Sequence, residues 1–430
     1  MRSVDIHFKN QATIRCIVLL MLTWALSPLL MGCSAKPNAS ILDYMVKAMP
    51  GQSTDAGYSA STLGLSDLSS FDVYVDNDQV VHIIASGKSA ATDRHTVIRY
   101  IRSEDGGHHW SDAVNIDRFP AVSGKRGNDI QLAASGRHLV ALWQTEGELP
   151  GMGPMITAIS SDHGKTWRTG VNPAVNDQGN QAYIDVIADQ HGTFHVTWLE
   201  DPEENGHQSL RYARSSDHGK HWSSPMTLDD STCSCCWNTL ALSSRNQLHV
   251  LYRDMVPRDM LLMQSSDGGQ TWRKASIVGD FQWYFEGCPH IGGGLKSVES
   301  NGFTHLHGIV WTGAEERAGL YHVTSSNHGQ SWSTPQKLGD MATNGDIAAL
   351  SGLHSATLAA IWNEVEPGGT RIFLSKSTNG GYSWSTPQRL SEPRHSPTHP
   401  RVVATRHGFL ALWTEKNASN HPELAWYAFE

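Results

Sequence analysis

The chain has few charged residues and few cysteines for its length. Of its 430 residues only 17% are charged and six are cysteine, and the formal net charge is −9. This shortage of basic residues argues against nucleic acid as a partner, because diffuse binding to phosphates needs a cationic surface that displaces counterions. A Gly-rich phosphate loop, a nucleophile elbow and a His-Glu-x-x-His motif are also missing from the sequence. We therefore expect no nucleic-acid partner and no required cofactor.

Long apolar runs are missing too, apart from a short one near the N-terminus. Residues 16–26 are apolar, follow the basic residues Arg2, Lys9 and Arg15, and precede the sequence Leu30-Met31-Gly32-Cys33. A run this short is typical of a secretory signal rather than a membrane span. The last four residues resemble the bacterial lipobox, although a chance Gly-Cys pair is the alternative.

The lipobox resemblance implies that Cys33 is lipidated and anchors the protein to a membrane. We therefore predict a lipoprotein signal peptide over residues 1–32 and a tether over residues 33–56. The implied location is the bacterial cell envelope, on the extracytoplasmic side, at the outer membrane or the periplasmic face.

Tryptophan and glycine are plentiful, with 15 and 39 residues, and many of them belong to a repeat. The pattern Ser-x-Asp-x-Gly-x-x-Trp occurs six times, twice with Asn in place of Asp, at a period of about 55 residues. Its Asp or Asn accepts backbone N–H groups two residues on, its Gly supplies a positive φ, and its Trp offers a large apolar face. The predicted structural residues are Asp105, Asp162, Asp217, Asp267, Asn327 and Asn379, with Trp110, Trp167, Trp222, Trp272, Trp332 and Trp384.

This repeat resembles the Asp box of sialidase-like β-propellers, which are also called BNR repeats. The resemblance implies a ring of four-stranded antiparallel blades. Between the boxes, an alternating strand that ends in an aromatic residue recurs, with a less regular first copy; the copies are 80–84, 139–143, 194–198, 248–252, 307–311, 358–362 and 409–413. Seven copies predict an all-β, seven-bladed β-propeller over residues 57–430, with a six-bladed ring and a stray hairpin as the alternative.

The last predicted blade has only three strands before the chain ends. The segment Tyr58–Leu63 resembles the outer strands at 332–338 and 384–390. We expect it to pair with Glu423–Phe429, because closing the ring in this way removes two exposed sheet edges.

The resemblance also implies a site at the central face. Sialidases clamp a carboxylate with three arginines and use a Tyr nucleophile activated by a Glu, together with an Asp acid/base. Their first arginine lies ahead of the first blade, whereas residues 34–70 here contain no arginine. Weak catalytic candidates are Arg126, Asp129, Tyr183, Arg253, Asp254 and Arg401. We expect glycan binding, with or without hydrolysis, and a non-catalytic module for a protein ligand is the alternative.

Four cysteines beyond Cys33 form a separate cluster in the sequence. Cys233, Cys235, Cys236 and Cys288 precede the innermost strands of two consecutive predicted blades. They resemble a Cys-x-Cys-Cys and Gly-Cys-Pro-His feature of a bacterial subset of Asp-box proteins, to which no activity is attached. Outside the cytosol, two disulfides are the simplest interpretation. A copper or zinc site that includes His290, or a redox pair, is the alternative.

Overall fold

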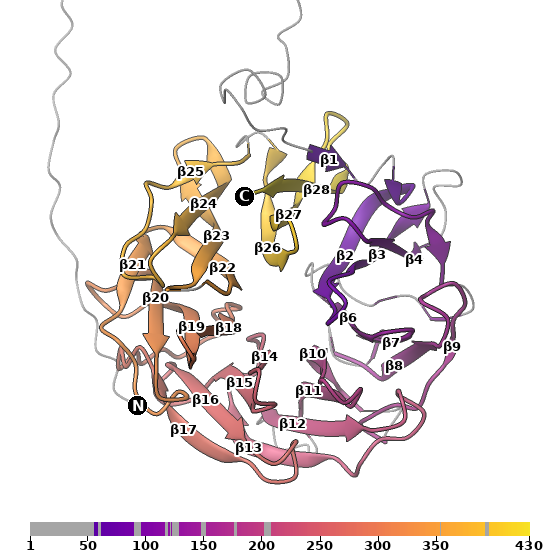
Figure 1. Ribbon diagram of the computed structural model, residues 1–430, viewed down its shortest axis with the longest axis horizontal. Helices are drawn as coiled ribbons and strands as arrows, with labels where there is room; N and C mark the ends of the chain where they lie inside the picture. Colours follow the sequence, from indigo (N-terminus) through magenta and orange to yellow (C-terminus); the bar gives the residue numbers. More distant parts are fainter. Residues whose placement is uncertain are drawn as a thin grey trace, which may run out of the picture.

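The computed structural model shows seven four-stranded antiparallel sheets arranged in a ring (Figure 1). It describes residues 56–58, 62–89, 96–116, 119–120, 122, 129–147, 152–175, 179–201, 208–352, 354–391 and 395–430. The predicted signal peptide, Cys33, nearly all of the tether and Arg126 lie outside these residues. No helix in the described ranges has the length and apolar character needed to cross a membrane. The predicted all-β, seven-bladed propeller is confirmed.

The first six blades follow the chain in order, and in each blade the first strand lies nearest the ring axis (Figure 1). The first three blades contain β2 (Leu65–Val75), β3 (Val81–Ser89), β4 (Thr96–Ser103) and β5 (Val114–Asn115); β6 (Ile130–Ser135), β7 (His138–Gln144), β8 (Met155–Ser160) and β9 (Arg168–Thr169); β10 (Ala182–Ala188), β11 (Phe194–Glu200), β12 (Gln208–Ser215) and β13 (Met226–Thr232). The next three contain β14 (Thr239–Leu242), β15 (Leu248–Arg253), β16 (Met260–Ser265) and β17 (Arg273–Val278); β18 (Gly294–Ser300), β19 (Phe303–Thr312), β20 (Gly319–Ser325) and β21 (Gln336–Gly339); β22 (Ala342–Leu350), β23 (Thr357–Glu366), β24 (Gly369–Ser377) and β25 (Gln388–Arg389). The seventh contains β26 (Thr398–Thr405), β27 (Gly408–Lys416), β28 (Pro422–Phe429) and β1 (Ala56–Tyr58).

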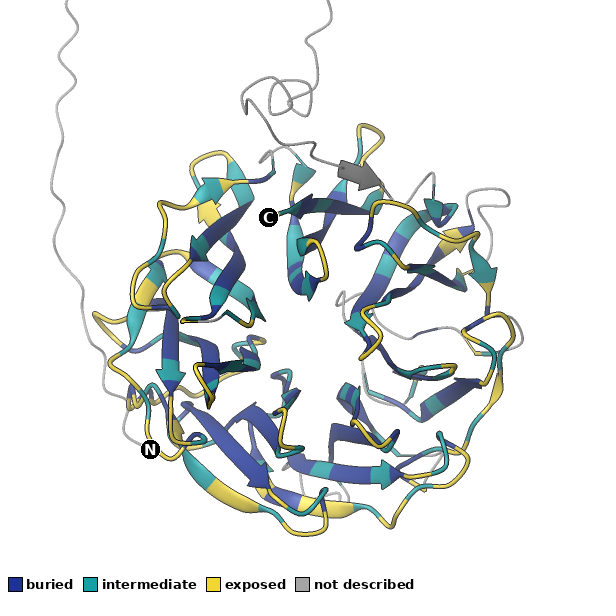
Figure 2. Cartoon of the chain, in the orientation of Figure 1, coloured by how far each residue is buried: buried dark blue, intermediate teal, exposed yellow. Residues whose placement is uncertain are grey.

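The second and third strands of the blades hold much of the core. Every residue of β11, β15 and β16 is buried, and Figure 2 shows the exposed residues mainly on outer strands and turns. Both faces of a middle strand are covered by adjacent blades, so apolar side chains are favoured on both faces. The six copies that end in an aromatic residue all fall in second strands, and the less regular copy 80–84 overlaps the second strand β3.

The six Asp boxes form the turns between the third and fourth strands of the first six blades. In the third blade, Asp217 Oδ1 accepts hydrogen bonds from Ser215 Oγ and from the backbone N–H of His221, both at 2.9 Å. Ser215 Oγ accepts the N–H of Gly219 at 2.8 Å, and Gly219 has a φ of 79°. The Asp therefore reaches a backbone N–H four residues on, rather than two as predicted from the sequence.

The tryptophans of the boxes contact the preceding blade. Trp167 packs edge-on against Tyr100 of the first blade with ring centroids 5.6 Å apart, and Trp332 Nε1 donates to Ser276 Oγ of the fourth blade at 2.9 Å. Trp110 meets Trp426 of the seventh blade at 5.8 Å, so the first box also takes part in closing the ring.

The ring closes because β1 pairs antiparallel with β28, with Tyr58 opposite Ala425. The predicted pairing is therefore present, but the predicted bounds are wrong. The strand covers Ala56–Tyr58, residues 59–61 lie outside the described ranges, and Leu63 is buried in a turn. This turn bends at Gly64, which has a φ of 60°, and leads the chain into β2. The seventh blade has no Asp box because its fourth strand comes from the other end of the chain.

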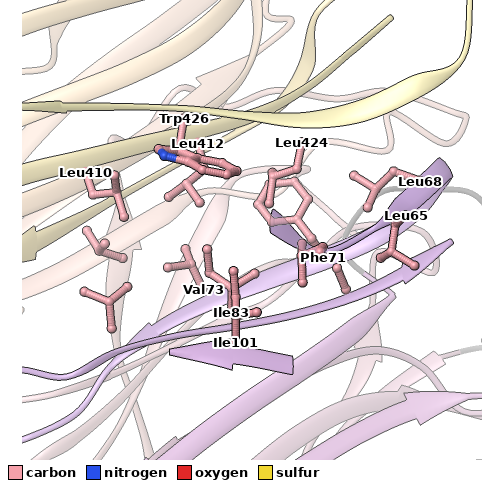
Figure 3. Packing of buried hydrophobic residues seen from close by; sticks show 14 of the residues in the cluster. Leu65, Leu68, Phe71, Val73, Ile83, Ile101, Leu410, Leu412, Leu424 and Trp426 are labelled. Atoms are coloured by element: carbon pink, nitrogen blue, oxygen red, sulfur yellow. The ribbon is translucent and has the colours of Figure 1, made fainter. Parts of the chain in front are cut away.

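A continuous apolar core joins the first and last blades. Figure 3 shows Phe71, Val73 and Ile83 of the first blade facing Leu424 and Trp426 of the seventh. Burying one large apolar side chain stabilises a fold by about 1.5–3 kcal/mol. The contact between the two ends of the chain is therefore a stable part of the propeller.

Candidate functional site

A cavity of about 610 Å³ lies on the ring axis, and all seven innermost strands or the residues leading into them line it. This volume is typical of a pocket for a small ligand, which ranges from about 300 to 1,000 Å³. The lining contains five charged side chains, which are Asp72, Asp185, Lys296, Asp346 and Arg401. Aromatic side chains of the lining include Tyr74 and Trp237.

The three aspartates of the cavity tie neighbouring blades together. Each of them lies on an innermost strand and accepts a backbone N–H from the innermost strand of the next blade. The bonds run from Leu132 to Asp72 at 2.9 Å, from Leu240 to Asp185 at 2.6 Å, and from Val402 to Asp346 at 3.0 Å. Oδ1 of Asp185 and Oδ1 of Asp346 also accept the backbone N–H of the following residue, at 2.8 and 2.9 Å. Both oxygens of these two carboxylates, and one oxygen of Asp72, therefore serve the fold.

Arg401 lies between two of these aspartates. Its Nη2 is 3.1 Å from Asp72 Oδ1, and its Nε is 3.4 Å from Asp346 Oδ2. Burial lowers the pKa of Arg401, but the two carboxylates outweigh this and raise it. The guanidinium is thus held as a cation and bridges the seventh blade to both of its neighbours.

The other charged groups of the cavity are less fully paired. Burial raises the pKa of Asp185 to about 7, with a further contribution from the charge of Asp72. The side chain of Lys296 forms no hydrogen bond or ion pair with the residues that the structure describes. At neutral pH the cavity therefore offers one available ammonium group and one carboxyl group that is close to its titration point.

Two of the predicted catalytic candidates lie outside the cavity lining and have structural contacts. Arg253 is buried, and its guanidinium donates to the backbone carbonyls of Ile291, Arg258 and Trp311 at 3.1, 2.5 and 2.9 Å. Asp254 lies beside it, where its backbone forms a β-bridge with Thr232. Burial raises the pKa of the Asp254 carboxyl. Arg253 therefore stabilises loops rather than clamping a ligand on the axis.

Two further candidates are also internal to the blades. Tyr183 is buried and packs edge-on against Trp237 at 5.1 Å, and Asp129 accepts a hydrogen bond from Gln144 Nε2 at 2.9 Å. Of the six candidates, Arg401 alone is in the described cavity lining, and Arg126 lies outside the described residues.

Four charged residues of the lining were not among the predicted catalytic candidates, namely Asp72, Asp185, Lys296 and Asp346. A signal for the aspartates exists in the sequence. Asp72, Asp185 and Asp346 each precede a β-branched residue and are 113 and 161 residues apart, about two and three times the box period. Lys296 has no comparable signal.

The cysteines form a second candidate site, at the edge of the cavity. The structure contains no disulfide among the described cysteines, so the predicted pairs are not found, and Cys233, Cys235, Cys236 and Cys288 are all free thiols. The first three are buried on the β13–β14 connection, and Cys288 is exposed on the β17–β18 connection. Hydrogen bonds from Cys235 and Cys236 lower the pKa of Cys233. His290 belongs both to this group and to the cavity lining.

Comparison with protein families gives a match to part of the chain. Residues 72–274 match the BNR repeat-like domain. The chain is therefore a seven-bladed β-propeller in which nearly half of the residues match a BNR repeat-like domain. Comparison with curated proteins gave no match.

Solved structures with a similar fold include carbohydrate-active enzymes. An ulvan lyase of a polysaccharide lyase family aligns with a TM-score of 0.55 and 11% identity over 84% of this chain and 94% of the lyase. The ulvan lyase bound to -[GlcA(1-4)Rha3S]- gives a TM-score of 0.53 and 12% identity over 84% and 93% of the two chains. The intramolecular trans-sialidase from Ruminococcus gnavus gives a TM-score of 0.49 and 13% identity over 86% and 96%. At these identities the likeness shows the fold.

Proposed function

We propose that the protein binds a glycan in the cavity on the propeller axis, through hydroxyl groups rather than through a clamped carboxylate. The observation that carries this proposal is the convergence of five charged side chains in one cavity of about 610 Å³. A similar fold in a lyase bound to -[GlcA(1-4)Rha3S]- supports a carbohydrate as the class of ligand.

The cavity supplies the groups that hydroxyl recognition needs. Carboxylate oxygens of Asp72, Asp185 and Asp346 accept hydrogen bonds from sugar hydroxyls, and Lys296 donates to them. Hydrogen bonds to charged groups are shorter and stronger than neutral ones. Tyr74 and Trp237 add aromatic surface to the lining, which suits the apolar face of a sugar ring.

A carboxylate clamp of the sialidase kind fits this cavity poorly. Arg401 is already bound by Asp72 and Asp346, so a ligand carboxylate beside it meets two negative groups. Arg253 is committed to three backbone carbonyls outside the lining. We therefore propose binding without sialidase-type hydrolysis, and with an anchor at Cys33 we place the protein on the extracytoplasmic side of a bacterial membrane.

To test this proposal, the detergent-solubilised full chain is titrated with neutral, sulfated and sialylated oligosaccharides, and binding is measured by calorimetry. Substituting Lys296→Ala is expected to weaken binding about tenfold or more, because it removes one charge-assisted hydrogen bond. The control is Lys220→Ala, an exposed lysine on an Asp-box turn outside the cavity lining, which should bind like the unaltered protein. The proposal fails if no oligosaccharide binds or if Lys296→Ala binds unchanged. Cleavage of a fluorogenic sialoside would show instead that the protein is a hydrolase.

A further inference from the structure

The cysteine cluster is independent of the glycan proposal, and its geometry indicates a different ligand. Sγ of Cys233 and Sγ of Cys235 are 3.7 Å apart. A disulfide requires about 2.05 Å, so these two sulfurs are not bonded to each other. Two thiolates on one tetrahedral zinc ion, each at about 2.3 Å from the metal, lie about 3.8 Å apart. The observed separation is that of two ligands of one ion.

The ligand-type atoms of this region form two groups of three that share Cys235. The sulfurs of Cys233, Cys235 and Cys236 all lie within 4.8 Å of one another. Cys235 also lies within 4.8 Å of both Cys288 Sγ and a ring nitrogen of His290, which come from a different loop. Cys235 is therefore shared by the buried sulfur triplet and the exposed Cys288–His290 pair. Next to Cys235, this exposed pair is the source of a fourth ligand that the described residues offer.

The surroundings favour a thiolate-rich centre. The three buried cysteines belong to an apolar core that also contains Tyr183, Leu240 and Tyr252. Three thiolates around a singly or doubly charged cation leave an excess of negative charge, which is costly in an apolar core unless cations compensate it. Arg253 interacts electrostatically with Cys236 and Cys233, and Arg258 with Cys233. These two arginines supply the compensation.

We propose that Cys233, Cys235 and Cys236, with Cys288 or His290 as the fourth ligand, bind one thiophilic metal ion, Cu(I) or Zn(II). Sulfur ligands select these ions over magnesium, calcium or manganese. The ion links the β13–β14 connection to the β17–β18 connection, and thus joins the chain segments that lead into the fourth and fifth blades. Because His290 also lines the central cavity, one side of the proposed metal centre borders that cavity.

The experiment uses the reduced, detergent-solubilised full chain without oxygen, and Zn²⁺ and Cu⁺ are titrated separately against a competing chelator. We expect one ion per chain, and Co²⁺ substitution should give the absorption of a thiolate-bound tetrahedral ion. Substituting Cys235→Ser should weaken binding by at least about 100-fold, which is more than the loss of a residue that only hydrogen-bonds to a ligand causes. A thermal-shift measurement should show stabilisation by the metal in the unaltered protein and little in this variant.

Surface substitutions keep the test decisive if Cys235→Ser disturbs the core. Cys288 and His290 are both exposed, so the double variant Cys288→Ser, His290→Ala should fold normally and bind the ion more weakly. The control His354→Ala, at an exposed histidine elsewhere, should bind like the unaltered protein. Equal metal binding by the unaltered protein and Cys235→Ser would overturn the proposal. So would a mass four protons below the thiol form in protein prepared anaerobically, because the cysteines would then be disulfide-bonded.

Discussion

Asp185 gives the fold a pH dependence that can be calculated. Burial raises the pKa of this carboxyl from 3.8 to about 7 in the folded protein. Between these values the folded state holds a proton that the unfolded state has released. The contribution of this group to the free energy of unfolding is therefore largest below about pH 4 and falls as the pH rises to about 7. The slope is at most about 1.4 kcal/mol per pH unit, which gives about 4 kcal/mol over the whole interval.

The substitution Asp185→Asn removes the titration but keeps an oxygen that accepts the N–H of Leu240. We expect its free energy of unfolding, relative to the unaltered protein, to increase by about 2–3 kcal/mol between about pH 5 and pH 8. Urea unfolding, followed by tryptophan fluorescence at several pH values, measures this difference. Asp185→Ala is the control, because it loses the acceptor and should be destabilised at every pH. A difference between the Asn variant and the unaltered protein that stays constant with pH would refute the reasoning.

Three further predictions concern closure, turns and location. Trp426→Ala should lower the free energy of unfolding by about 3–5 kcal/mol, because Trp426 belongs to the core that closes the ring. The control Tyr382→Ala, at an 86% exposed residue, should change the free energy of unfolding little. Equal losses in the two variants would contradict the role of this core. Asp217→Ala should cost about 1 kcal/mol in urea unfolding. Asp217→Asn should cost less, because Asn327 accepts the same backbone bond in its own box. Cys33→Ser should release the protein from the membrane fraction, and unchanged partitioning into detergent would exclude the lipid anchor.

The architecture could be predicted because its signals are local and repeated. Each box contains its own turn, whose Ser, Asp and Gly bond to one another within a few residues. The seven copies of the alternating strand, six of which end in an aromatic residue, then give the number of blades. The bounds of β1 could not be predicted in the same way. This strand has only three residues, and its position depends on pairing with β28 and on the bend at Gly64.

The central site was harder to predict because its residues lie far apart in the sequence. Whether an arginine faces the cavity depends on tertiary contacts, and Arg253 and Arg401 show the two outcomes. Arg253 is the last residue of the fully buried strand β15 and is surrounded by backbone carbonyls, whereas Arg401 lies in the innermost strand β26 between two carboxylates. No pattern in the neighbouring residues distinguishes these environments.

The inter-blade hydrogen bonds have a consequence for how binding can be studied. Asp72, Asp185 and Asp346 each line the cavity and also bond the next blade, so a substitution there changes the ring and the pocket together. Lys296 lines the same cavity but forms no bond that links blades in the described residues. A loss of binding in Lys296→Ala with unchanged unfolding therefore reports on the ligand alone. A loss in an aspartate variant has to be compared with its stability before it is assigned to the ligand.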